Sequence, residues 1–198
     1  MIEKSGDDYY LRLKKEYDYL RKKFSLIPLE KHLWKFLRSR PGNFPTIRIA
    51  QFAKLIFISS ALFSKILEAK TINDFNKLFT VNPSDYWENH YLFNKESVRK
   101  SKALGKSAFE TIIINTIIPL LFIYGKANGM MQLQERSLKL LEEIKPEKNS
   151  VVAKWNDLGI KTTSAFGTQA LIQLKNTYCN HKKCLNCHIG NSLIRTNK

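Results

Sequence analysis

The apolar run AFETIIINTIIPLLFIY, residues 108–124, constrains the fold of this chain more than any other stretch. It is shorter than the about 20 residues that a membrane-spanning helix needs, and it contains Glu110, Asn115 and Pro119. A helix that is apolar on all sides yet too short for a bilayer is typical of the centre of a folded domain. We therefore predict a buried central helix and no membrane span, with a kink where Pro119 removes one backbone donor.

Apolar residues recur at steps of three and four along much of the remaining chain, which is the period of an amphipathic helix. The first such stripe is formed by Tyr10, Leu13, Tyr17, Leu20 and Phe24. The same reasoning predicts further helices over residues 29–37, 47–67 with a break near Ser59, 73–79, 130–144, 146–159 and 162–178. No segment shows convincing strand alternation. We predict an all-α fold.

The expected architecture is a single-domain bundle of about eight to ten short helices with a cysteine-containing C-terminal loop. One helical domain is expected to cover residues 1–198, with flexible ends at residues 1–6 and 191–198. The first residues, MIEKSGDDYY, have no apolar segment of the kind that a secretory signal needs. A cytoplasmic protein is therefore expected, in which cysteines serve as thiols or metal ligands rather than as disulfides.

Charge is the strongest signal in the composition. The 198 residues include 33 Lys and Arg against 17 Asp and Glu, a formal net charge of +16. A field of that sign favours nucleic acid or an anionic membrane surface as a partner. The alternative is a protein whose lysines are merely well solvated, and the basic residues are spread along the whole chain.

The segment YCNHKKCLNCHIG, residues 178–190, contains all three cysteines of the chain and two of its four histidines. A C-x2-C pair is a common half-site for zinc, and the candidate ligands are Cys179, Cys184, Cys187 and His181, with His188 as a substitute for His181. The basic neighbours Lys182 and Lys183 are candidates for contact with an anion. The alternative is a C-terminal clasp in which the three thiols converge without metal. Zinc is the cofactor that the sequence suggests.

A second candidate site is the turn RSRPGNFPTIR, residues 38–48. Arg38, Arg40 and Arg48 surround a rigid Pro-Gly-Asn-Phe-Pro turn, for which Asn43 is the expected helix N-cap. Arginine forks beside a helix N-terminus suit phosphate or carboxylate. Alternatively, these arginines cap helix ends and pair with acidic residues.

A third group of basic residues lies in the polar segment 95–106, which we predict to be a long exposed connection. It consists of Arg99, Lys100, Lys102 and Lys106. A solvated loop accounts for this run as well as an anion site does. In DYWENHY, Glu88 and His90 are two residues apart, and His90 is interpreted as a structural or exposed residue.

Several long motifs together resemble an uncharacterised family described only as a domain of unknown function, found mostly in Bacteroidetes. They are LWKFLRSRPGNFPTIRIAQFAKL, SDYWENHY, IIINTIIPLLFIYG and TQALIQLKNTYCNHKKCLNCHIG. The resemblance is to the C-terminal half of relatives about twice this size, whose N-terminal half carries Asp/Glu–His motifs loosely similar to nuclease cores. It implies a helical partner domain separated from a companion, and it transfers no catalytic residue.

The sequence contains no Gly-rich phosphate loop, no GxSxG and no HExxH. We therefore expect a non-catalytic helical domain that binds an anionic partner, with nucleic acid favoured. Two alternatives stay open. One is a fragment of an enzyme, nuclease-like in kind, whose catalytic half or companion chain is missing. The other is a purely structural helical module.

Overall fold

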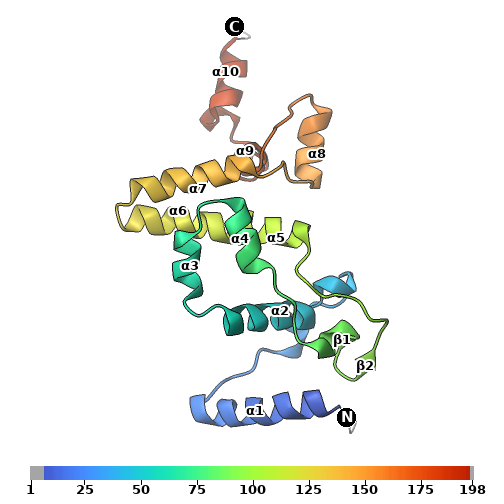
Figure 1. Cartoon of the computed structure of the whole chain (residues 1–198). Helices are drawn as coiled ribbons and strands as arrows, with labels where there is room; N and C mark the ends of the chain where they lie inside the picture. The colour runs from blue at the N-terminus through green and yellow to red at the C-terminus, as the bar shows by residue number, and fades with distance from the viewer. Residues whose placement is uncertain (1–6, 197–198) are drawn as a thin grey trace. The chain divides into compact units, whose positions relative to one another are not determined.

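The computed structural model describes residues 7–196, which divide into two compact units (Figure 1). The first unit holds residues 7–65 and 76–106, and the second holds residues 66–75 and 107–196. Helices α3 (Leu62–Glu68) and α4 (Ile72–Phe79) contribute residues to both units. Each unit is described by itself below, and a single domain over residues 1–198 stays a prediction.

The first unit combines two longer helices with short turns and one small hairpin (Figure 1). Its elements are α1 (Asp8–Phe24), α2 (Pro45–Ile58), β1 (His90–Leu92), β2 (Lys95–Glu96) and the 3₁₀ turns Lys31–Leu33, Pro41–Asn43 and Asp85–Glu88. Asp7 caps α1, because its carboxylate accepts a hydrogen bond from the Tyr10 N–H at 3.2 Å. Helix α1 ends at Phe24, and its C-cap, Ser25, adopts a left-handed conformation with φ 50°.

Aromatic rings attach the start of α1 to the 3₁₀ turn Asp85–Glu88. The Tyr86 ring is stacked between Tyr9 and His90, at centroid distances of 4.2 and 4.0 Å. Trp87 is buried and meets both tyrosine rings edge-on, and its indole N–H donates to the Tyr9 hydroxyl at 3.2 Å. His90, interpreted from the sequence as structural or exposed, is buried, and its Nδ1 lies 2.8 Å from the Tyr86 carbonyl oxygen.

The polar end of this cluster joins the Tyr86 hydroxyl to the Asp7 carboxylate. Burial raises the pKa of Asp7, but hydrogen bonds from Tyr86 and from the backbone N–H groups of Tyr10, Asn94 and Tyr9 outweigh it and leave the pKa lowered. Burial and the bond to Asp7 raise the pKa of Tyr86 to about 12. One bond therefore favours the ionised carboxylate and the neutral phenol.

Replacing Tyr86 with Phe keeps the ring stack and removes this bond. We expect the free energy of unfolding to fall by about 1 kcal/mol at neutral pH, a modest value because Asp7 is accessible to solvent. The Asp7 contribution is fully present above its ordinary pKa of 3.8 and is lost as the pH falls through the lower folded value. The Tyr86 contribution is fully present below pH 10 and is lost as the pH rises through about 12.

Urea titrations followed by tryptophan fluorescence over this pH range measure both effects. The Tyr86→Phe variant is expected to lose less stability than the parent chain at each extreme of pH. Equal losses in the two proteins would show that the hydrogen bond between Tyr86 and Asp7 does not contribute to the free energy of unfolding.

The second unit is built around a helical hairpin, α6–α7, whose two helices lie side by side in Figure 1. Its elements are α5 (Lys106–Ile112), a π turn (Ile113–Ile117), α6 (Ile118–Ala127), α7 (Met131–Glu143), α8 (Ser150–Asp157), α9 (Ala165–Leu174), a second π turn (Lys175–Cys179), a 3₁₀ turn (Cys184–Asn186) and α10 (His188–Thr196). Gly129 lies in the connection between α6 and α7. Its φ of 65° is a left-handed backbone conformation, which glycine adopts more readily than other residues.

The central apolar run forms one long helix, Lys106–Ala127, interrupted by the π turn. The Ile118 N–H bonds the Ile113 carbonyl five residues back, directly before Pro119, which has no N–H to donate. The predicted irregularity at Pro119 therefore takes the form of a wider turn. Ile113 and Leu121 are fully buried, but Ile123 is 64% exposed. One side of this helix therefore faces solvent, although its residues are apolar on every side.

By length and composition this helix could also cross a membrane, and α2 with α3 could form a second, bent candidate. In the structure 39% of the most apolar window of the helix is buried. The core helix of a globular protein passes the same test, so one such helix is weak evidence. The absence of a membrane span stays a prediction.

Two residues of equal size on α6, Leu121 and Ile123, test which face of this helix is packed. Leu121→Ala should lower the free energy of unfolding by about 2–5 kcal/mol, because Leu121 is 0% exposed and its loss leaves a cavity. Ile123→Ala, two residues further on, should change it by less than about 0.5 kcal/mol. Chemical denaturation of the two variants measures both, and equal costs would contradict the packing of α6.

The prediction of an all-α fold of short helices is confirmed, since helices dominate and the described residues contain only the β1–β2 hairpin as a sheet. The break near Ser59 is also confirmed, because α2 ends at Ile58. The helix predicted over residues 29–37 is wrong, since only the turn Lys31–Leu33 forms there. Residues 191–196 belong to α10, and the other residues predicted as flexible ends lie outside the described range.

Candidate functional site

The candidate site at residues 38–48, called the arginine turn below, leads directly into helix α2. A 3₁₀ turn, Pro41–Asn43, precedes the helix, and Pro45 stands in its first turn. The N-cap is Phe44, and no side chain caps the helix, so the prediction that Asn43 is the N-cap is wrong. Instead, the Asn43 side-chain oxygen accepts a hydrogen bond from Arg48 at 2.6 Å.

Arg48 is held by two neutral amides. One terminal nitrogen of its guanidinium donates to Asn43 Oδ1 at 2.6 Å and the other to Gln51 Oε1 at 2.9 Å. No carboxylate of the described residues lies within ion-pair distance of it. The side chain is half-buried, and burial lowers the pKa of the Arg48 guanidinium from its ordinary value. The positive charge is thus fixed in place and left uncancelled.

Gln51 connects Arg48 to the segment that follows the hairpin. Its side-chain nitrogen donates to the Lys102 backbone carbonyl at 2.7 Å, and both residues are buried. The Lys102 ammonium donates to the carbonyls of Glu88 and Lys100, each at 3.0 Å. It also lies 4.0 Å from the centroid of the Tyr91 ring, within cation–π range.

Lys102 is only 5% exposed, so the prediction that residues 95–106 form a solvated connection is wrong at this position. A buried ammonium needs hydrogen-bond acceptors, and the two carbonyls supply them. Its charge is therefore engaged inside the first unit. Among the predicted anion-binding residues, Lys102 has the least access to an external partner.

Arg38 and Arg40 are exposed on the turn before α2. Arg38 has a left-handed backbone with φ 61°, and the Arg40 carbonyl accepts the Asn43 N–H at 2.7 Å. Rings anchor the same turn, because Phe44 meets Phe36 and Tyr91 edge-on at 5.3 and 6.4 Å. Two exposed arginines thus lie on the ordered turn to which Arg48, in the first turns of α2, is hydrogen-bonded through Asn43.

Arg99 differs from these residues because a carboxylate neutralises it. Its Nε donates to Glu88 Oε2 at 2.6 Å, and a terminal nitrogen lies 2.5 Å from the same oxygen. Both side chains line a surface hollow of about 340 Å³. Lys100 is exposed nearby, and its backbone N–H bonds the Glu88 carbonyl at 2.8 Å. Arg99 is therefore a weaker candidate for anion binding than the arginine turn.

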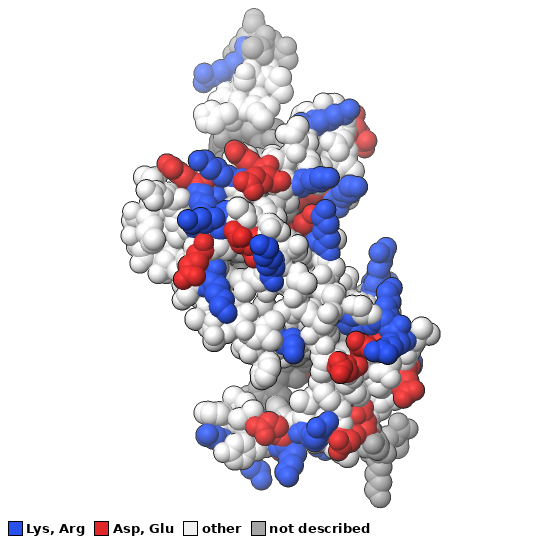
Figure 2. Space-filling model, in the orientation of Figure 1, with Lys and Arg blue, Asp and Glu red and all other residues white. Residues whose placement is uncertain are grey.

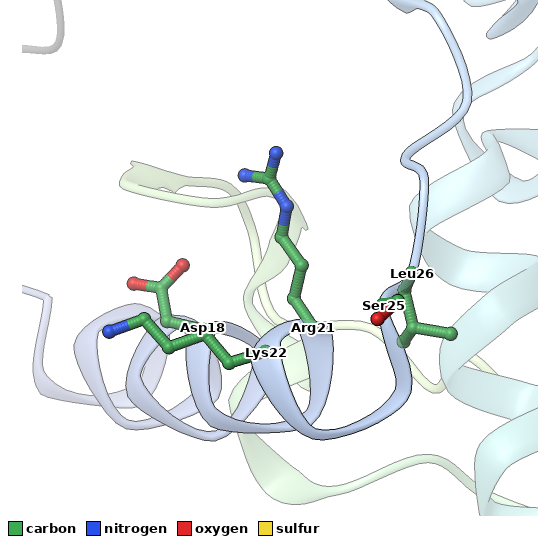
Figure 3. A pocket seen from close by; sticks show the side chains of 5 residues that line it. All are labelled: Asp18, Arg21, Lys22, Ser25 and Leu26. Carbon is green, nitrogen blue, oxygen red and sulfur yellow. The ribbon is translucent and has the colours of Figure 1, made fainter.

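A larger hollow, of about 510 Å³, lies at the C-terminal end of α1 (Figure 3). Figure 3 shows Asp18 and Arg21 projecting from the helix into the same open space. Lys22, Ser25 and Leu26 complete the lining. Because both signs of charge face this space and no sequence-predicted site residue lines it, we assign it no function.

The three cysteines are free and lie near the C-terminal end of the described chain. Cys179 ends the second π turn, Cys184 begins a 3₁₀ turn, and Cys187 directly precedes α10. Cys179 and Cys184 are exposed, as are His181, Lys182 and Lys183. Within residues 7–196, no group of three or more His, Cys, Asp or Glu is placed to hold a metal ion. Zinc binding stays a prediction.

The space-filling view shows the charged side chains on the visible face of each unit (Figure 2). Lys and Arg side chains gather beside the β1–β2 hairpin of the first unit, with acidic side chains next to them. Over α6 and α7 of the second unit, both signs are mixed. The surface over α2 is largely uncharged, and its exposed side chains include Ile49, Phe52, Ile56 and Phe57.

Sequence reasoning missed the part that buried polar residues play in this site. Gln51 lies four residues after Ile47 and four before Leu55, and all three are buried on one face of α2. A polar residue within a buried helical stripe is a recognisable signal for a hydrogen bond in the core. The partner, the Lys102 carbonyl, is 51 residues away, and nothing in the sequence identifies it.

Comparison with known families places most of the chain in one family model. A family described as "Protein of unknown function (DUF2851)" matches residues 1–150. The matched range includes the arginine turn, Lys102 and Arg99, and it ends before the cysteine segment. Comparison with curated proteins and with solved structures gave no match.

Replacing Lys102 with Met tests its structural role. Met retains the apolar packing of the stem but leaves the Lys100 carbonyl without this donor and the Glu88 carbonyl with only the Lys100 N–H, so we expect a loss of about 1–3 kcal/mol in the free energy of unfolding. Lys100→Met, at an exposed position, is the matched control and should change stability by less than about 0.5 kcal/mol. Urea denaturation measures both, and an unchanged Lys102→Met variant would contradict this role.

Proposed function

The chain belongs to the DUF2851 family, and for this member we propose a helical, non-catalytic module that binds an anionic partner, with nucleic acid as that partner. The observation that carries the proposal is the environment of Arg48. Its guanidinium is oriented by Asn43 and Gln51, which are neutral, so its charge remains available to an anion. An oriented and uncancelled arginine suits a phosphate group.

The surroundings of Arg48 support the same proposal. Arg38 and Arg40 are exposed on the turn that leads into α2, and neither has an ion-pair partner among the described residues. The net charge of +16 attracts a polyanion at long range, whatever the local contacts. Lys100, Lys182 and Lys183 are exposed and serve in this proposal as additional phosphate contacts.

An enzyme fragment is the first alternative. In this proposal the chain corresponds to the C-terminal half of larger relatives, mostly from Bacteroidetes, and a missing N-terminal half or companion chain completes an active site. One feature favours such a companion: α2 exposes Ile49, Phe52 and Ile56 on the face opposite its buried stripe. Exposed apolar faces of this kind mark surfaces that contact a partner. An adjacent reading frame that encodes the missing half would support this alternative.

The second alternative is a structural helical module whose charge is incidental. A cytoplasmic location and zinc at the cysteine segment are further parts of the proposal that rest on the sequence alone. Zinc is tested by elemental analysis of protein purified without added metal. The structural alternative is separated from nucleic-acid binding by the salt dependence of binding, because phosphate contacts release counterions.

The double variant Arg40→Gln/Arg48→Gln tests the arginine turn. Binding to duplex and to single-stranded DNA is measured by fluorescence anisotropy across a range of salt concentrations. Each lost phosphate contact reduces the slope of log K against log salt by about 0.9 for a duplex, so the double variant should flatten it by about 2. An unchanged slope would remove this turn from the proposed interface.

Arg12→Gln is the matched control for the same measurement. Arg12 carries the same charge in the same unit, but it forms an ion pair with Asp8 at 3.2 Å. Its replacement should alter the slope by less than half as much as the double variant does. Far-UV circular dichroism confirms that all variants remain folded, since Arg48 also has a structural role.

A further inference from the structure

Cys184 and Cys187 stand at the two ends of one tight turn. The 3₁₀ turn Cys184–Asn186 is closed by a hydrogen bond from the Cys187 N–H to the Cys184 carbonyl at 3.2 Å. Side chains three residues apart in a 3₁₀ turn lie on the same side of it. A turn closed in this way also keeps the two Cα atoms within about 7 Å, the range in which a disulfide can form.

Helix α10 holds this turn in place. The Gly190 residue in its first turn packs so closely on Cys184 that an added Cβ would lie 2.6 Å from the Cys184 carbonyl oxygen and 3.1 Å from its Cα. Glycine is therefore the residue that allows this approach. The Asn191 N–H in turn bonds the Cys187 carbonyl at 2.8 Å and continues the helix. Both cysteines are thus positioned by the same short element.

Both cysteine residues are also accessible to solvent. Cys184 is exposed, Cys187 is half-buried, and neither is bonded to another cysteine. We propose that Cys184 and Cys187 are a redox-active dithiol that forms a reversible disulfide with a low-molecular-weight disulfide as oxidant. This site is distinct from the arginine turn and does not depend on nucleic-acid binding, and Cys184 and Cys187 form the disulfide only when no zinc is bound to them.

The exchange proceeds in two balanced steps. The exposed Cys184, as its thiolate, attacks one sulfur of the small disulfide; that S–S bond breaks, and one small thiolate leaves and takes up a proton. The Cys187 thiolate then attacks the Cys184 sulfur of the mixed disulfide and displaces the second small thiolate, which is also protonated. The two cysteines lose two electrons and two protons, and the small disulfide gains both and becomes two thiols.

The test uses the reduced full-length chain, equilibrated with mixtures of oxidised and reduced glutathione, quenched with acid and alkylated. Peptide mass spectrometry should find Cys184 and Cys187 joined, with the peptide lighter by two hydrogen atoms, and Cys179 alkylated. Cys179→Ser should give the same result, whereas Cys184→Ser and Cys187→Ser should stop at a mixed disulfide with glutathione. A disulfide to Cys179 in the parent chain, or mixed disulfides alone, would overturn the proposal.

The role of the fold is tested by Gly190→Ala, which forces the Cys184 turn away from α10. We expect the equilibrium constant for disulfide formation to fall about tenfold, equivalent to about 30 mV. Gly105→Ala is the matched control, because a Cβ there meets no atom within 4 Å, and it should leave the constant unchanged. Equal constants for the two variants and the parent chain would show that the turn does not position the thiols, and the inference would fail.

Discussion

An excess of cations is the constraint on which the rest of this structure depends. With 33 Lys and Arg against 17 Asp and Glu, nearly half of the basic side chains cannot pair with a carboxylate inside the same chain. Burying such a charge without a partner is costly. The chain meets this cost with neutral acceptors: carbonyls and a ring for Lys102, two amides for Arg48 and the Leu67 carbonyl for Arg136.

These contacts also tie distant segments together within each unit. The Lys102 ammonium joins the 3₁₀ turn at Glu88 to the chain after β2, and Gln51 joins the Lys102 backbone to α2. In the second unit, Arg136 on α7 reaches the Leu67 carbonyl at the end of α3, and burial lowers the pKa of its guanidinium. Each bond satisfies a polar group and connects segments that are far apart in the sequence.

How far the sequence predicted the structure depends on the range of the interaction involved. Predictions from local sequence were correct where the helical pattern of apolar residues is strong. The apolar run forms a helix that is buried at Leu121, and an irregular turn precedes Pro119. These predictions failed at residues 29–37, where Phe36 alone is half-buried and Leu37 is 86% exposed. They also failed at Lys102, because its acceptors lie on backbone atoms that only the folded chain brings near.

The choice of neutral acceptors bears directly on the proposed function. A carboxylate cancels the field of the cation it binds, as Glu88 does for Arg99. An amide or a carbonyl solvates a cation but leaves its formal charge in place, so the field outside the protein persists. At Arg48 that field emerges beside the exposed turn of Arg38 and Arg40. The arrangement that lets the first unit bury cations therefore also keeps its surface attractive to an anion.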